Sequence, residues 1–87
     1  MASHPDTARL VIEISISTES LDREKAPLYA EAGIPEYWIV LPARNAIEQF
    51  TQPLNGQYLS HRIIVAEATC TSTEFAGLQV RLADWLA

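Results

Sequence analysis

Two short segments rich in branched apolar residues constrain the fold of this chain most strongly. The first is Leu10–Ile16 (LVIEISI) and the second is Tyr37–Leu41 (YWIVL). Both are shorter than a typical helix, and the continuous apolar run of the first indicates a strand buried on both faces. A segment with helical spacing separates them. The chain is therefore predicted to form a parallel strand–helix–strand unit with the usual right-handed connection.

The segment between the two strands is predicted to be a helix that ends near Ala32. Ser17–Ser20 supplies several candidate N-caps, Gly33 suits the position after the helix, and Pro35 stops its continuation. Pro27 lacks a backbone donor and is expected to kink the helix or delay its start. One helical stripe is predicted to face the sheet, and it consists of Leu21, Lys25, Leu28, Tyr29 and Ala32.

The rest of the chain is predicted to add a hairpin and one more short element. Ala46–Thr51 and Tyr58–Val65 alternate in polarity on either side of the turn-like sequence Pro53–Gly56. The last apolar residues form a short edge strand or a final turn, and they are Leu78, Val80, Leu82, Trp85 and Leu86.

Composition places the chain among small globular proteins. It has 87 residues, of which 48% are hydrophobic and 20% charged, and this is too apolar for intrinsic disorder. Six Lys and Arg against eleven Asp and Glu give a net charge of −5, which argues against nonspecific binding to nucleic acid or to anionic membranes. The single cysteine, Cys70, excludes an internal disulfide. With no leader-like start and no apolar run long enough to span a bilayer, a soluble cytoplasmic domain is expected.

Glu13 is the first candidate site residue because it lies in the middle of an apolar strand. Alternation puts it on the same face as Val11 and Ser15. A buried carboxylate is costly unless it is paired, hydrogen-bonded or bound to a cation. The alternative is that Glu13 lies near an edge or cleft and is simply solvated.

Lys25, the only lysine of the chain, is the second candidate. Its place on the predicted sheet-facing stripe would let the ammonium neutralise Glu13, stabilise a phosphate or orient an attacking water. The alternative is an ordinary surface lysine. Asp22 is more typical of an acid in the first turn of a helix, although it could approach the same cleft.

Other common site patterns are missing from the sequence. His4 and His61 lie far apart and have no acid or second histidine at a metal-ligand spacing, so a zinc site is not expected. There is no serine-hydrolase elbow and no glycine-rich phosphate loop. Trp38 and Trp85 are interpreted as core anchors, and Cys70 as incidental.

The chain resembles the Uma2 family, which comprises restriction-endonuclease-like proteins of the PD-(D/E)XK nuclease superfamily. Leu10–Ser15 is similar to the family's strand motif LVVEVS, and Asp22–Val40 (DREKAPLYAEAGIPEYWIV) is similar to its string DRxxKxxxYAxAGIPEYWIVD. The ending, Ala76–Leu86, resembles the closing family motif more loosely. The resemblance implies an α/β fold with a restriction-endonuclease-like core, a mixed β-sheet and a crossover helix.

The resemblance also implies a nuclease site that hydrolyses DNA. In the superfamily an Asp and a Glu hold Mg²⁺, and a Lys assists the attacking water or the charge of the transition state. Glu13 matches the catalytic and metal-binding glutamate. Ser15 stands where a lysine would complete an E-x-K motif, and Lys25 matches the lysine that the family has displaced onto the following helix. Asp22 is an accessory candidate.

The sequence departs from the family at the metal-binding aspartate. Only nine residues precede the first strand, so the strand or hairpin with the PD motif is missing, and Asp6 is not assigned its role. Ile16 and Leu41 stand where the family often has Asp. We expect residues 1–8 to be a leader and residues 9–87 to be a single domain that corresponds to the C-terminal part of the fold.

Three interpretations of function follow. The first is a Mg²⁺-dependent endonuclease domain in which Glu13 binds the metal and Lys25 acts on water or phosphate. The second is a catalytically inactive remnant that serves as a scaffold or associates with itself, as a homodimer, through an exposed sheet edge. The third is an α/β domain that binds a small molecule or a protein. No contact with a membrane is expected.

Overall fold

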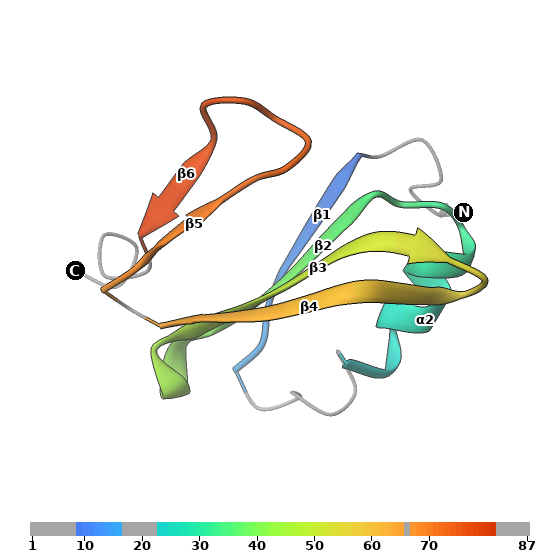
Figure 1. Cartoon of the computed structure of the whole chain (residues 1–87). Helices are drawn as coiled ribbons and strands as arrows, with labels where there is room; N and C mark the ends of the chain where they lie inside the picture. Colours follow the sequence, from blue (N-terminus) through green and yellow to red (C-terminus); the bar gives the residue numbers. More distant parts are fainter. Residues whose placement is uncertain (1–8, 17–22, 66, 82–87) are drawn as a thin grey trace, which may run out of the picture.

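A four-stranded mixed sheet forms the centre of the computed structural model, which describes residues 9–16, 23–65 and 67–81 (Figure 1). In the order in which they lie side by side, its strands are β1 (Leu10–Ile14), β2 (Glu36–Leu41), β3 (Ala46–Leu54) and β4 (Gln57–Val65). β1 and β2 are parallel, whereas β2–β3 and β3–β4 are antiparallel. The predicted α/β class and the mixed sheet with a crossover helix are confirmed.

Each face of the central sheet carries its own cover. The helix α2 (Ala26–Glu31) packs on the face that includes Tyr37, Ile39 and Phe50. The opposite face carries a two-stranded sheet made of β5 (Thr69–Thr71) and β6 (Gln79–Arg81). On that face the core consists of Trp38, Val40, Ile47, Ile64, Cys70 and Val80. All six residues of β2 are buried, because this strand is covered on both sides.

The helix α2 begins later than the sequence pattern predicts. A turn at Lys25 precedes it, and Pro27 occupies its first turn. Proline has no N–H to give to a preceding carbonyl, so a helix restarts at this point rather than running through it, as expected. The predicted N-caps and Leu21 lie in residues 17–22, outside the described part of the chain.

The face that α2 buries also differs from the predicted stripe. Ala26 and Ala30 are the buried residues of the helix, whereas Leu28 is 66% exposed and Ala32 is exposed. The restart at Pro27 rotates the helix relative to the continuous one assumed from the sequence. Alanine methyl groups then lie against the sheet and allow a close approach between helix and sheet.

β1 is an edge strand and is not buried on both faces as its apolar sequence predicts. The strand ends at Ile14, and the side chains of Ile14 and Ile16 are 60% and 80% exposed. No described strand pairs with its outer edge. A continuous apolar run therefore occurs in edge strands as well as in buried strands, and the sequence alone does not distinguish the two.

The predicted hairpin is confirmed, and its strands extend to the turn itself. Asn55 and Gly56 form that turn with φ of 54° and 77°, the left-handed pair that tight hairpins require. Gln52 also has a positive φ, of 62°, and lies between the paired residues Thr51 and Pro53 of β3. β6 matches the predicted short strand around Val80, whereas β5 was not predicted, and residues 82–87 lie outside the described part.

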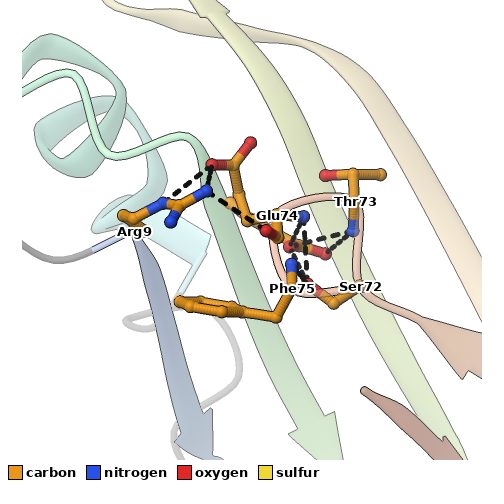
Figure 2. A network of polar contacts seen from close by, with 6 residues as sticks. Arg9, Ser72, Thr73, Glu74 and Phe75 are labelled. Atoms are coloured by element: carbon orange, nitrogen blue, oxygen red, sulfur yellow. Dashed lines mark hydrogen bonds and ion pairs between the residues drawn. The ribbon is translucent and has the colours of Figure 1, made fainter. Parts of the chain in front are cut away.

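Glu36, a residue that the sequence analysis did not single out, connects the two sheets. It is 0% exposed and begins β2. Its carboxylate accepts hydrogen bonds from Trp38 Nε1, Gln49 Nε2 and Ser72 Oγ, each at 2.7 Å, and from the backbone N–H groups of Thr73 and Glu74 at 3.2 and 3.3 Å. The turn that supplies these last donors lies between β5 and β6, and Figure 2 shows its residues Ser72, Thr73 and Glu74. The carboxylate of Glu36 therefore fixes the small sheet to the large one.

Arg9 contacts the same turn on its solvent-exposed side. Its guanidinium pairs with the Glu74 carboxylate at 3.3 Å, donates to the Glu74 carbonyl oxygen at 3.2 Å and lies 5.0 Å from the centre of the Phe75 ring (Figure 2). These contacts are largely exposed, so they add less than the buried carboxylate does.

Burial alone would raise the pKa of Glu36, but hydrogen bonds from Ser72, Gln49, Trp38 and Thr73 outweigh it and lower the pKa below 4.5. Glu36→Gln should destabilise the fold by about 3 kcal/mol, because an amide nitrogen would face hydrogen-bond donors. The contribution of the carboxylate is present above about pH 4.5 and is lost as the pH falls through the lowered folded-state pKa. Urea denaturation at pH 7 and in this acid range should therefore show a steeper acid loss in the wild type than in the variant.

The exposed variant Glu67→Gln is the matched control and should leave the free energy of unfolding unchanged. Equal acid dependence in the wild type and in Glu36→Gln would contradict the role given to Glu36.

Candidate active site

β1 and the residue before α2 bring Glu13 and Lys25 together on the helix-covered face. Lys25 Nζ lies 3.3 Å from Glu13 Oε1. The two side chains are 45% and 23% exposed, so the pair is open to a ligand from solution. Of the predicted stripe, Leu28 and Ala32 are exposed, whereas Tyr29 packs against the core and Lys25 reaches Glu13 from the N-cap position of α2.

Two tyrosine hydroxyls complete the surroundings of Glu13. Tyr29, from α2, donates to Oε2 at 2.9 Å, and Tyr37, from β2, donates to Oε1 at 3.1 Å. The centres of the two rings are 4.8 Å apart. Tyr29 lies on the predicted sheet-facing stripe, but neither hydroxyl was predicted to be a partner of Glu13. The parallel pairing of Val11 with Tyr37 is what places the second ring beside the carboxylate.

The hydrogen bonds around Glu13 limit what it offers to a metal ion. A carboxylate has about four lone-pair positions, and three are used by Lys25, Tyr37 and Tyr29. Mg²⁺ requires about six oxygen ligands in octahedral geometry. Within residues 9–16, 23–65 and 67–81, no group of three Asp, Glu, His or Cys side chains is placed to hold a metal. The described residues therefore do not fit Mg²⁺ by themselves.

A second carboxylate, Glu48, lies on the same face of the sheet and was not predicted as a site residue. Glu13 and Glu48 both pair in register with Ile39, one from each side, so a single strand separates them. Glu48 is buried and accepts hydrogen bonds from Arg23 Nε and Nη2. It also contacts His61 Nε2 at 2.8 Å. The pairing of β3 with β4 brings His61 to this position.

The partners of Glu48 favour the ionised form of its carboxylate. Burial alone would raise the pKa, but the hydrogen bonds and charges of Arg23 and His61 lower it below 4.5. The alternating sequence around Glu48 predicts an exposed polar side. It gives no sign that the residues preceding α2 cover this part of the strand.

Aromatic rings connect the two carboxylate centres. Tyr37 stacks on Phe50 with 5.6 Å between ring centres. Phe50 stacks on His61 at 4.3 Å with an angle of 7° between the planes. Because Tyr37 binds Glu13 and His61 binds Glu48, this row of rings runs from one centre to the other.

The remaining candidates of the sequence analysis have mixed outcomes. Trp38 is a fully buried core residue as expected. Cys70 is also fully buried, and desolvation raises its pKa to about 11, so the thiol is a core side chain that stays protonated. Four others lie outside the described residues, namely His4, Asp6, Asp22 and Trp85. None of the helices in the described ranges is long and apolar enough to cross a membrane.

Comparison with known proteins gives one match. A family model named Uma2, with the description "Putative restriction endonuclease", matches residues 2–83. No curated protein and no solved structure shows significant similarity to the chain.

Lys25→Met should change the free energy of unfolding by less than about 1 kcal/mol, because a partly exposed ion pair contributes little to stability. Urea denaturation followed by tryptophan fluorescence measures the difference, with Glu36→Gln as the destabilised reference. A loss comparable to that of Glu36→Gln would show that Lys25 is a structural residue.

Proposed function

Because the chain belongs to the Uma2 family of restriction-endonuclease-like proteins, we propose that it hydrolyses phosphodiester bonds of DNA at the Glu13–Lys25 pair. The observation that supports this site is the contact of 3.3 Å between the Lys25 ammonium and the Glu13 carboxylate. A strand carboxylate beside a lysine is the arrangement that the family resemblance implies for a nuclease centre.

The exposure of the pair supports the proposed roles. The ammonium of Lys25 lies near the surface and can approach a phosphate oxygen while its stem covers the sheet. There it would stabilise the negative charge that grows on the phosphate during attack by water. Glu13 would orient or deprotonate that water, and the hydroxyls of Tyr29 and Tyr37 would hold the carboxylate in place.

We propose Mg²⁺ as the cofactor on the basis of family membership. Glu13 would be one ligand, through the lone pair that its three donors leave open. The described residues supply no second carboxylate at this position. The further oxygen ligands would therefore come from residues outside the described part, with Asp22 as the accessory candidate, and from the phosphate itself.

We also propose a second function, which two observations favour. The carboxylate of Glu13, which accepts three hydrogen bonds, is typical of a structural ion pair, and the edge strand β1 exposes Ile12, Ile14 and Ile16. An apolar strand with a free backbone edge is suited to pairing with a second copy. The domain would then be an inactive scaffold that forms a homodimer through β1.

Cleavage of supercoiled plasmid DNA tests the first function. The wild type should nick the plasmid in the presence of Mg²⁺ or Mn²⁺, and Glu13→Gln and Lys25→Met should each reduce the rate at least about 100-fold, as loss of a catalytic group does. Agarose gels over time give the rates.

Glu67→Gln removes an exposed carboxylate away from the pair and should cleave at the wild-type rate. Equal residual cleavage by the wild type and by both site variants would rule out Glu13 and Lys25 as the catalytic pair. Calorimetric titration with Mg²⁺ should show binding that Glu13→Gln abolishes, and wild-type protein that takes up no Mg²⁺ would contradict the proposed cofactor.

Light scattering after size exclusion tests the second function. If β1 pairs with a second copy, the wild type elutes as a dimer and Ile14→Lys elutes as a monomer, because a charge on an edge strand opposes pairing. Ile14 is 60% exposed, so the substitution should leave the fold intact. A wild-type protein that stays monomeric at a concentration of about 100 micromolar would exclude the scaffold proposal.

A further inference from the structure

A pocket of about 280 Å³ lies on the helix-covered face, between the residues around the start of α2 and strand β4. The residues that matter for its chemistry are Arg23, Pro27, Phe50, Gln57, Tyr58 and His61. Its volume is near the lower end of the range for small-molecule sites. The pocket is separate from the Glu13–Lys25 pair, and neither residue of that pair lines it.

Glu48 fixes the proton on the ring nitrogen of His61 that faces it. A carboxylate held ionised can only accept a hydrogen bond, so His61 Nε2, at 2.8 Å from Glu48 Oε1, must carry a proton. In the neutral ring, Nδ1 is then the acceptor. No described residue bonds to Nδ1, and His61 lines the pocket with its side chain partly exposed. In the state in which the His61 ring is neutral, the pocket therefore contains a hydrogen-bond acceptor at Nδ1.

The aromatic walls of the pocket are held rigidly. The His61 ring lies flat on Phe50, with 4.3 Å between ring centres. Tyr58 contacts the same Phe50 ring at 5.9 Å, and its hydroxyl donates to the Ile34 carbonyl oxygen at 2.7 Å. Aromatic walls beside an acceptor at Nδ1 of the neutral His61 ring suit a flat ring that carries an N–H donor on its edge.

We propose that this pocket binds one unpaired base of a DNA strand, with His61 Nδ1 accepting a hydrogen bond from the amino or imino group of the base. The identification of the ligand as a DNA base rests on the proposed function. A base inside a duplex exposes only its edges, so a pocket of this kind takes a base only after it has left the stack. Gln57 lines the same pocket, and its side-chain amide can donate to a carbonyl group of a base.

The charges around the pocket favour a base over a phosphate. The guanidinium of Arg23 binds the Glu48 carboxylate through two nitrogens, so its positive charge is largely matched within the protein. The whole chain carries a net charge of −5, which further opposes binding of a free anion. Stacking and hydrogen bonding do not depend on excess positive charge.

The test compares nucleotides with the same molecule without its base. The four deoxynucleoside monophosphates and deoxyribose 5-phosphate are titrated separately into the full chain in EDTA, while NMR follows the ring signals of His61 and Tyr58. At least one nucleotide should shift both rings in a saturable manner, and deoxyribose 5-phosphate should not. Absence of a shift with all four nucleotides would overturn the proposal, and so would an equal shift with the sugar phosphate.

The variant His61→Phe separates the contribution of the hydrogen-bond acceptor from that of the aromatic ring. Phenylalanine keeps the ring on Phe50 and removes both nitrogens, so the apparent Kd for the preferred nucleotide should rise about fivefold or more. Unchanged affinity would exclude the acceptor role. The ligand comparison on the wild type does not depend on this variant folding.

Because these titrations involve no cleavage and no metal, they are independent of the plasmid assay. Base binding without cleavage would count against the Glu13–Lys25 pair alone, and cleavage without base binding would count against the pocket alone.

Discussion

The carboxylate of Glu36 is the interaction on which the arrangement of the two sheets depends. A fully buried negative charge is tolerated only when donors surround it, and here they come from β2, β3 and the turn between β5 and β6. Its position at the start of β2 means that the central strand and the small sheet are fixed by one group. The apolar residues of β5 and β6 can then cover Trp38 and Val40 from the side opposite the helix.

Two further carboxylates lie on the helix-covered face, and their surroundings differ in a way that bears on function. Glu48 is buried, and its main partners are a bidentate arginine and a histidine, so its charge is compensated inside the fold. Glu13 is partly exposed and has one flexible ammonium and two neutral hydroxyls. A ligand can therefore exchange with the lysine at Glu13 at a modest cost. Displacing Arg23 from Glu48 would leave a buried charge without its cation.

Much of the fold could be predicted from the sequence because it depends on local patterns. Alternation and turn residues predicted the strands and the hairpin, and the contact of Glu13 with Lys25 was predicted from one strand face and one helix stripe. The burial of β1 was predicted wrongly, and so was the placement of Leu28 and Ala32 against the sheet. These properties depend on how many neighbours a strand has and on where a helix restarts after Pro27, and the sequence pattern records neither.

The buried acids were missed for a related reason. Glu36 precedes an apolar strand and Glu48 lies in an alternating one, so both have the pattern of exposed residues. Their donors come from distant parts of the chain, Ser72 for Glu36 and Arg23 for Glu48. A buried acid of this kind is recognised only when the tertiary fold is known. The roles of Glu13, Lys25 and Asp22 in catalysis stay predictions.

The distance between Glu13 and Lys25 depends in part on apolar side chains of α2. Ala26 and Ala30 are the only residues of α2 that are buried within its described length, and each presents a single methyl group to the sheet. The thickness of that methyl layer contributes to the separation between α2 and the sheet, and hence to how far the ammonium must extend. Two apolar side chains therefore influence the distance between Glu13 and Lys25. A bulkier residue at either alanine position would increase that distance without contacting either charged group.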